Sequence, residues 1–244
     1  MKIREFLYKL LVPRICIMCG EPMSHDTKIP FCDDCIKIWE EYLDEKCNMC
    51  GLDRFECHCV PKMIRKINSV AIWSIFYCSN HEEPNSLIYS IKTGERKKTI
   101  DYFTDLMKRT LIAKCMANKI RYKDYVITFA PRQYKGIRKF GHDHAEMLAK
   151  SLGKKLGIKV VRMLENNSKV QQKKLNKSER VENAFNAYEY IEGSLEGKRK
   201  VFIVDDIMTT GATLCACAFL LYENGAKDVI PVTLAKDNFG YMIK

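Results

Sequence analysis

Residues 200–214 read Lys-Val-Phe-Ile-Val-Asp-Asp-Ile-Met-Thr-Thr-Gly-Ala-Thr-Leu, and this stretch decides the fold class. Four consecutive apolar residues, Val201 to Val204, are typical of a strand that is buried on both faces of a parallel sheet. Asp205 and Asp206 follow directly, at the carboxyl end of the strand, where open α/β sheets place their ligands. The stretch therefore predicts a ligand site at a strand end.

The loop after the aspartates predicts that this ligand carries a phosphate. It contains Thr209, Thr210, Gly211, Ala212 and Thr213. Glycine lets the backbone approach an anion, threonine hydroxyls donate to its oxygens, and the amides that open the next helix supply partial positive charge. The alternative is a strand followed by an N-capped helix, with Asp206 or Thr209 as the cap. We favour the phosphate site because a cap needs one such residue, whereas six polar or small positions occur together here.

The order of a hydrophobic strand, two aspartates and Thr-Thr-Gly-Ala-Thr resembles the phosphoribosyl pyrophosphate (PRPP) loop of type I phosphoribosyltransferases. In that family the carboxylates hold the ribose hydroxyls, directly or through magnesium, and the Thr/Gly loop wraps the 5-phosphate. The resemblance implies that Asp205 and Asp206 take the catalytic carboxylate role and that residues 209–213 bind the phosphate. It also implies Mg²⁺, bound together with PRPP.

Eight of the twelve cysteines form four close pairs within the first 60 residues. The pairs are Cys16 and Cys19, Cys32 and Cys35, Cys47 and Cys50, and Cys57 and Cys59. A two-residue spacer lets two thiolates face one ion, and a glycine after the second cysteine, as at Gly20 and Gly51, supplies the turn. The pairs therefore predict one or two structural zinc ions, with reduced thiols or redox chemistry as the alternatives.

Spacing leaves the ligand pairing open. Sequential pairing predicts a double zinc ribbon, interleaved pairing is also compatible with the spacing, and His58 could replace Cys57 or Cys59. The second site is the weaker prediction, because only six residues separate its pairs and its last spacer is a single residue. The remaining cysteines, Cys78, Cys115, Cys215 and Cys217, lie in apolar surroundings that favour a core position.

Length and pattern predict two domains. The 244 residues and the 47% hydrophobic content suit one sizeable domain and one small one. Residues 1–62 are expected to hold an N-terminal helix, over 1–12, and the zinc ribbon; residues 63–244 are expected to form the phosphoribosyltransferase-like domain. Strands are predicted over 70–77, 125–129, 158–161, 201–204 and 228–234. Helices are predicted over 98–119, over 142–156 and from Leu214 onward, with Gly225 as the C-cap of the last. This alternation predicts an α/β fold: a parallel sheet with helices on both faces.

The positive charge lies in the middle of the chain. The net charge is +11, and residues 121–200 hold 19 lysines and arginines against 9 acidic residues, whereas residues 1–60 hold 8 against 11. Such a field favours nucleic acid or a pyrophosphate-bearing substrate, unless the lysines only solvate helix faces.

No apolar run approaches the roughly 20 residues that span a bilayer, so we expect a cytoplasmic protein without a membrane span.

Three further segments resemble the ComF competence family. They are Ile91–Gly94, Ala130-Pro131-Arg132 with residues 138–145, and the spaced set that runs from Gln172 to Phe185. Phe140, His142, Asp143 and His144 depart from the pattern of that family. By resemblance, Arg132, Arg138, Lys139, Arg180 and Asn183 are candidates for contact with pyrophosphate or nucleic acid, although Arg180 and Asn183 could instead tie down a loop. His142 and His144 are expected to cap or to hydrogen-bond.

Two functions compete. The ComF resemblance implies a protein that binds PRPP or a related ribose phosphate and single-stranded DNA, and that acts in DNA uptake during natural transformation beside a competence helicase. Tyr122, Tyr125, Tyr134 and Tyr188 are then candidate stacking residues, although tyrosine is more often a core or rim residue. The alternative is an active magnesium-dependent phosphoribosyltransferase with an unidentified acceptor, in which Arg132 and nearby lysines stabilise pyrophosphate. A zinc-dependent interaction module is a third possibility. We favour the first, because no acceptor-pocket motif is recognisable.

Overall fold

The computed structural model describes residues 14–60, 72–78, 96–133, 137–138, 141–167, 185–195, 197 and 200–237. Several predictions lie outside these residues: the helix over 1–12, the Ile91–Gly94 segment, most of the set from Gln172 to Phe185, and the individual residues Tyr134, Lys139, Arg180 and Asn183.

A parallel sheet of four strands forms the centre of the fold, in the order β3-β8-β7-β4. Its strands are β3 (Trp73–Cys78), β4 (Val126–Phe129), β7 (Lys200–Met208) and β8 (Asp228–Asp237). The predicted parallel α/β sheet is thus confirmed. The strand predicted over 158–161 is wrong in extent: a single bridge joins Val160 to Ile127. Ile127 donates to the carbonyl of Lys159 and accepts from the N–H of Val161, whereas the N–H of Ile158 donates back to the carbonyl of Gly153.

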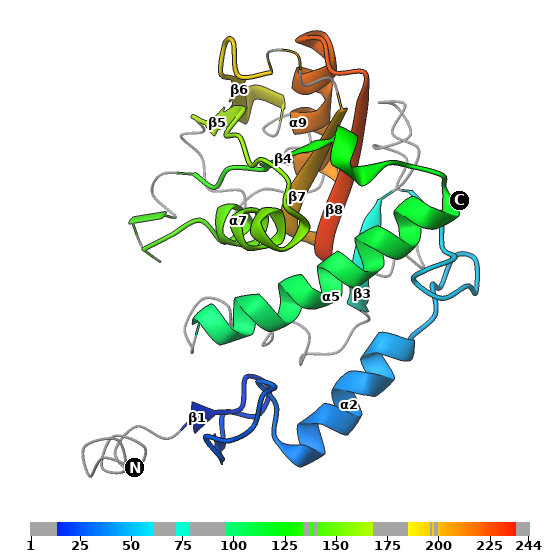
Figure 1. Cartoon of the computed structure of the whole chain (residues 1–244), viewed down its shortest axis with the longest axis vertical. Helices are drawn as coiled ribbons and strands as arrows, with labels where there is room; N and C mark the ends of the chain where they lie inside the picture. The colour runs from blue at the N-terminus through cyan, green and yellow to red at the C-terminus, as the bar shows by residue number, and fades with distance from the viewer. Residues whose placement is uncertain are drawn as a thin grey trace.

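Helices cover both faces of the sheet (Figure 1). Helices α5 (Arg96–Ala117) and α7 (His144–Leu156) pack on one face, and α9 (Ala212–Glu223) packs on the other. Strand β7 shows why, since Phe202 and Val204 join the core of α5 and α7, whereas Val201 and Ile203 join the core of α9. Alternate residues of a strand face opposite sides, so an uninterrupted apolar run is what a two-sided core requires.

The cysteine-rich segment shares its core with the sheet. It contains β1 (Arg14–Ile15), β2 (Pro22–Met23) and helix α2 (Asp33–Asp44), which lies beside α5 in Figure 1. Trp39 of α2 is fully buried, its ring lies 5.0 Å from that of Phe76, and its indole N–H donates to the Tyr102 hydroxyl at 2.8 Å. Aromatic burial therefore attaches α2 to β3 and α5. The boundary predicted near residue 62 falls outside the described residues.

Two smaller elements accompany the central sheet. Strands β5 (Leu164–Asn166) and β6 (Tyr188–Tyr190) pair antiparallel, and a 3₁₀ turn, Tyr122–Asp124, precedes β4. Cys115, Cys215 and Cys217 are buried, as predicted, whereas the side chain of Cys78 is not described.

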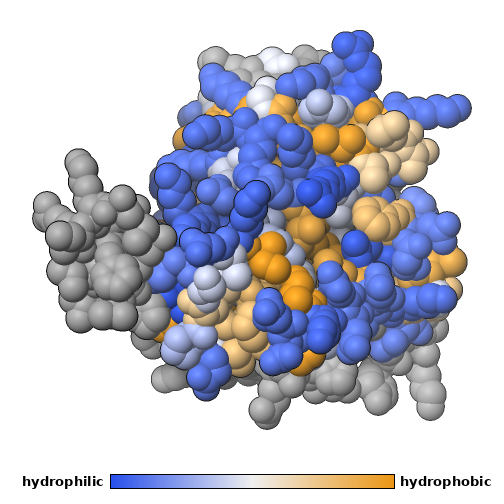
Figure 2. Space-filling model, turned by 60° about the horizontal axis from the view of Figure 1, so that its bottom comes forward, coloured by the Kyte–Doolittle hydropathy of each residue, from blue (hydrophilic) through white to orange (hydrophobic). Residues whose placement is uncertain are grey.

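The face drawn in Figure 2 is mostly hydrophilic, with apolar side chains gathered near its centre. Within the described residues, no helix has both the length and the apolar character that crossing a membrane requires.

Candidate functional site

The two aspartates lie where β7 loses one of its two neighbouring strands. Pairing between β4 and β7 ends at Phe129 and Val204, whereas β7 continues along β8 as far as Met208. The strand is therefore longer than the predicted run 201–204, because β8 still supplies hydrogen-bond partners after β4 has turned away. Asp205 and Asp206 lie on this one-sided stretch, at the carboxyl edge where parallel sheets bind ligands.

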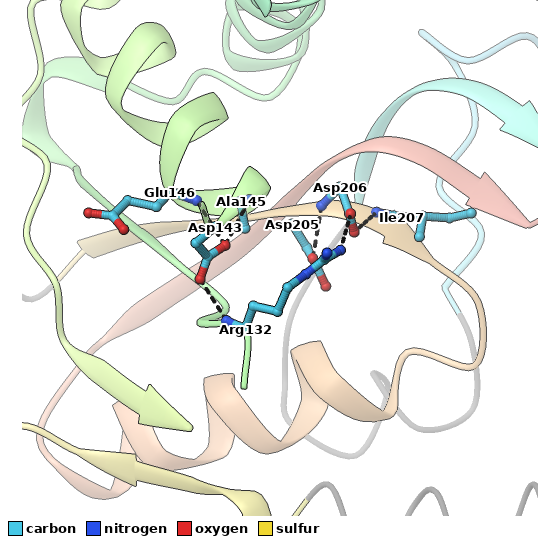
Figure 3. A network of polar contacts seen from close by, with 7 residues as sticks. All are labelled: Arg132, Asp143, Ala145, Glu146, Asp205, Asp206 and Ile207. Carbon is cyan, nitrogen blue, oxygen red and sulfur yellow. Dashed lines mark hydrogen bonds and ion pairs between the residues drawn. The ribbon is translucent and has the colours of Figure 1, made fainter. Parts of the chain in front are cut away.

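An arginine from the neighbouring strand end faces these carboxylates (Figure 3). Arg132 follows β4, and its Nη2 lies 3.2 Å from Oδ2 of Asp206. The backbone N–H of Asp206 donates to Oδ1 of Asp205 at 2.8 Å, and the N–H of Ile207 donates to Oδ1 of Asp206 at 2.8 Å. Both carboxylates are thus held in place by the backbone. The fold brings together Arg132, Asp205 and Asp206, which the sequence analysis had named separately.

Asp143 connects the Arg132 loop to helix α7, as the dashed contacts of Figure 3 show. Its Oδ2 accepts from the backbone N–H of Arg132 at 2.6 Å, and its Oδ1 accepts from the N–H groups of Ala145 and Glu146 at 3.1 and 3.4 Å. Burial raises the pKa of Asp143, and the Arg132 N–H opposes that shift. The cap of α7 is therefore this aspartate, between the two histidines that were expected to cap.

The loop after β7 forms the start of helix α9. Gly211 is the N-cap, at φ +79° in the left-handed region that favours glycine, and no side chain caps the helix there. The Thr210 hydroxyl accepts from the N–H of Ala212 at 3.3 Å. The alternative with Asp206 or Thr209 as the cap is therefore wrong. Thr210 thus occupies the amide of Ala212, whereas the glycine cap supplies no side chain that would cover the amides that follow in the first turn of α9, which leaves these amides able to face an anion.

The sequence analysis missed a support for this loop. Asn166 on β5 donates through Nδ2 to the carbonyl of Pro131 at 3.1 Å, and the Tyr188 side chain hydrogen-bonds with those of Thr213 and Asn166. The small sheet thus connects the Pro131 turn to the loop of residues 209–213. A polar residue in a short strand gives no sequence signal of such a role, since its partners lie more than 20 residues away.

The other predicted contact residues fall into different environments. Arg138 is exposed. Tyr125 and Tyr188 are 3% and 7% exposed, and Tyr125 stacks on Phe202 with ring centroids 4.3 Å apart. These two tyrosines belong to the core, so their assignment as stacking platforms for nucleic acid is wrong. Their burial among apolar neighbours depends on the folded chain and not on the residues beside them in the sequence.

Asp205 is held in an unfavourable electrostatic environment. Desolvation by burial raises its pKa well above the ordinary value, and the negative charge of Asp206 raises it further. Neighbouring carboxylates of this kind are typical of sites that bind a cation or hydroxyl groups, because a ligand can relieve the repulsion.

Replacing Asp205 by asparagine is expected to stabilise the unliganded protein by on the order of 1 kcal/mol at neutral pH. The folded state binds the Asp205 proton more tightly than the unfolded state, so the stability of the wild type falls as pH rises from about 4 through the raised pKa. Asparagine does not titrate and can still accept from the Asp206 N–H. Urea denaturation at pH 4 to 8 should therefore show the advantage of the variant growing with pH, whereas Glu165→Gln, at an exposed position, should show no such trend. A difference in stability between the variant and the wild type that does not change with pH would contradict this prediction.

The eight N-terminal cysteines form two clusters. Cys16, Cys19, Cys32 and Cys35 make the first cluster, and Cys47, Cys50, Cys57 and Cys59 make the second; in each, the four Sγ atoms lie within 4.8 Å of one another. The pairing is therefore sequential rather than interleaved. His58 is exposed and belongs to neither cluster. Four thiols at this spacing are a donor set that could hold a zinc ion.

Both clusters use the turn that the sequence predicts. Gly20 and Gly51 have φ of +79° and +69°, and their N–H groups donate to the carbonyls of Cys16 and Cys47 at 3.0 and 2.8 Å. Burial acts to raise the pKa of Cys16, but backbone N–H groups, including that of Cys32, lower it to about 7. Cys16 is thus the thiol of the first cluster whose environment favours the thiolate, the form that binds metal, whereas burial raises the pKa of Cys19 and Cys35.

In the second cluster, Cys57 has a lowered pKa through contacts with side chains, whereas burial raises the pKa of Cys47 and Cys59. Burial acts to raise the pKa of Cys57, but a hydrogen bond from the Tyr77 hydroxyl and the positive charge of Lys236 lower it to about 6. Tyr77 lies on β3 and Lys236 lies on β8. The second cluster is therefore in contact with the edge of the central sheet.

A parallel sheet with paired aspartates and a glycine-capped helix defines a phosphoribosyltransferase-like protein, and comparison with known families agrees. The phosphoribosyl transferase domain model matches residues 111–242, so the chain belongs to this family. The chain is 24% identical over 238 residues to competence protein ComFC of Streptococcus pneumoniae (strain ATCC BAA-255 / R6), covering 91% of this chain and 99% of the relative. It is thus a ComF-like member of the family.

Among solved structures, one of Trypanosoma cruzi hypoxanthine phosphoribosyl transferase matches with a TM-score of 0.36 and 13% identity. That match covers 59% of this chain and 68% of the other.

Proposed function

We propose that this protein binds PRPP or a related ribose phosphate together with Mg²⁺, binds single-stranded DNA, and acts in DNA uptake during natural transformation. The observation that carries the proposal is the arrangement of Asp205, Asp206 and Arg132 around a glycine-capped helix start, in a phosphoribosyl transferase domain. The name of its pneumococcal relative, a competence protein, supports the role in transformation. Two zinc ions, one in each cysteine cluster, complete the proposed holoprotein.

Each part of a ribose phosphate has a matching group at this strand end. The carboxylates of Asp205 and Asp206 suit ribose hydroxyls or a magnesium ion, which prefers oxygen ligands. The amides of α9 and the hydroxyls of Thr209, Thr210 and Thr213 suit the 5-phosphate. Arg132 suits the pyrophosphate, but it now pairs with Asp206. Binding of a pyrophosphate would therefore exchange one partner of Arg132 for another and leave Asp206 available to the cation.

An active phosphoribosyltransferase is the second candidate, because Arg132 lies where positive charge could stabilise a departing pyrophosphate. In the absence of an identified acceptor, the first function remains the better supported one. Binding alone requires only the groups that the site already brings together.

Calorimetric titration of the purified protein with PRPP, with and without magnesium, tests the site. We expect saturable binding that requires magnesium, since the two carboxylates otherwise repel the phosphates. Pyrophosphate release, followed in the same samples, separates the two candidates: binding without release supports the first, and release that depends on an added acceptor supports the second. No binding of PRPP or of ribose 5-phosphate would contradict the proposal.

Single-stranded DNA is expected to bind through the basic segment 121–200, with an affinity that falls steeply with salt. Arg138, Lys154 and Lys159 are exposed members of this segment. Each of them that contacts a phosphate should, when replaced by alanine, reduce the slope of log affinity against log salt concentration by about 0.7. Fluorescence anisotropy of a labelled oligonucleotide at several salt concentrations measures the slope. Lys37→Ala, an equally exposed change on α2, is the control, and an affinity insensitive to salt would contradict the basic surface.

A further inference from the structure

Two lysines of the phosphoribosyltransferase domain are buried against the second cysteine cluster. Lys114 on α5 is 1% exposed, and Lys236 on β8 is 4% exposed. Nζ of Lys114 donates to the carbonyl of Cys57 at 2.9 Å, and Nζ of Lys236 donates to the carbonyl of Cys59 at 3.2 Å. Nζ of Lys236 also lies 3.6 Å from Sγ of Cys57. Both ammonium groups therefore converge on the Cys57 and Cys59 pair.

These buried charges require a compensating charge. Burying an ammonium group is costly unless it is paired and hydrogen-bonded. Within the described part of the chain, the hydrogen-bond acceptors of the two lysines are atoms of Cys57 and Cys59, and no carboxylate lies at ion-pair distance from either. Two carbonyls and one sulfur of the cluster thus accept from these cations, and Nζ of Lys236 also lies over the Tyr77 ring, 5.2 Å from its centroid.

A metal in the cluster would supply the compensating charge. Four thiolates around one divalent zinc leave two negative charges in excess, and the two lysines carry two positive charges. Groups outside the first coordination shell of this kind orient the ligands and tune the affinity for the metal. The Cys57 and Cys59 pair has a single-residue spacer, unlike the two-residue spacers of the other pairs. The two lysines hold the carbonyls of both cysteines, and these contacts take the place of the turn that a two-residue spacer provides.

We propose that Lys114 and Lys236 are positioning residues of the second metal centre, which neutralise its excess charge and hold the Cys57 and Cys59 pair in its ligating geometry. This inference rests on the proposed binding of zinc. It makes the second centre a part of the phosphoribosyltransferase domain, since its cations come from α5 and β8, and Figure 1 shows the end of α5 beside the segment that carries the cluster.

The strand β8 extends this contact toward the ribose phosphate site. Lys236 is paired in register with Tyr77 of β3 and with Met208 of β7. Met208 immediately precedes the Thr209–Thr213 loop. The second metal centre therefore supports the end of the strand that lies next to the beginning of that loop.

Release of zinc from the full-length protein to an excess of a coloured chelator tests the proposal. The wild type is compared with Lys114→Met, Lys236→Met and the double variant, because methionine keeps much of the volume and removes the charge. One of two zinc equivalents is expected to leave about 10- to 100-fold faster in the variants, with the other unchanged. Lys97→Met, at an exposed position of the same helix α5, is the matched control.

Urea denaturation of the metal-free proteins distinguishes charge balance from simple packing. If the lysines act through the metal, the metal-free methionine variants should be at least as stable as the metal-free wild type, since a buried charge has been removed. Two results would overturn the role of the lysines but leave the zinc proposal standing. One is an equal loss of stability in the methionine variants with and without metal. The other is release of both zinc equivalents from these variants at the wild-type rate. A wild type that carries no zinc would overturn the zinc proposal as well. The single variants are measured separately, so the result does not depend on the folding of the double variant.

Discussion

Changing both Asp205 and Asp206 to asparagine is expected to lower the affinity for magnesium-bound PRPP by about a hundredfold or more. Each charged hydrogen bond or ion contact contributes about 1.5–3 kcal/mol, so that losing two of them reaches this factor. The amides keep the shape of the site and can still accept the backbone bonds from the N–H groups of Asp206 and Ile207. The loss should therefore report on charge and not on unfolding.

Calorimetric titration of PRPP in the presence of magnesium measures this effect, with urea denaturation as the check on folding. The exposed change Glu165→Gln is the matched control and should bind as the wild type does. The single change Asp206→Asn releases Arg132 from its ion pair, so its loss of magnesium-dependent affinity should be smaller than that of the double variant. If the double variant bound PRPP with wild-type affinity, the assignment of the site to residues 205–213 would be wrong.

Changing Cys16 to serine is expected to remove one zinc per chain and to lower the free energy of unfolding by more than about 3 kcal/mol, because structural zinc binding contributes directly to folding. Cys16 is buried in the same hydrophobic cluster as Phe31 and Trp39, so the first cluster and the α2 packing depend on each other. Loss of the metal should therefore loosen α2 from α5 as well as the turn at Gly20.

Metal analysis after native purification and urea denaturation measure these two effects. Cys115→Ser is the control, because Cys115 is equally buried but lies in neither cluster. The Cys115→Ser variant should keep the full zinc content, and its free energy of unfolding should fall only by the effect of placing a hydroxyl in the core. A wild-type content well below one zinc per chain would refute metal binding by the clusters. Equal zinc content in the Cys16→Ser variant and the wild type would show that this thiol is not a ligand.

Local patterns predicted the elements that depend on neighbours in the chain. The run Val201 to Val204 predicted a buried strand, and its continuous apolar character follows from burial on both faces. The Cys-x-x-Cys-Gly turns at Gly20 and Gly51 were predicted for the same reason, since a turn is built from consecutive residues. Sequence analysis failed where the partner is distant, as with the 158–161 segment, which pairs with Ile127 at one residue only.

The candidate site was predicted only in part. Asp205, Asp206 and the loop to Thr213 are contiguous and were visible in the sequence, whereas the ion pair of Arg132 with Asp206 joins residues 74 positions apart. The bond from Asp143 to the Arg132 amide and the support from Asn166 were missed, because single polar residues carry no pattern of their own. Tyr125 and Tyr188 were candidate stacking residues for DNA and lie in the core.

The sequence alone determined the class of this protein: a parallel sheet, a strand that ends in two aspartates, a glycine-containing loop at the start of the next helix, and cysteines spaced for metal. These features are encoded by periodicity and by short spacings, which act over a few residues. Only the tertiary structure decided that the cysteines pair sequentially, that Arg132 faces Asp206, and that Lys114 and Lys236 close on the second cluster. Each of these depends on strand order and helix packing, which bring distant residues within the few ångströms over which charges and hydrogen bonds act.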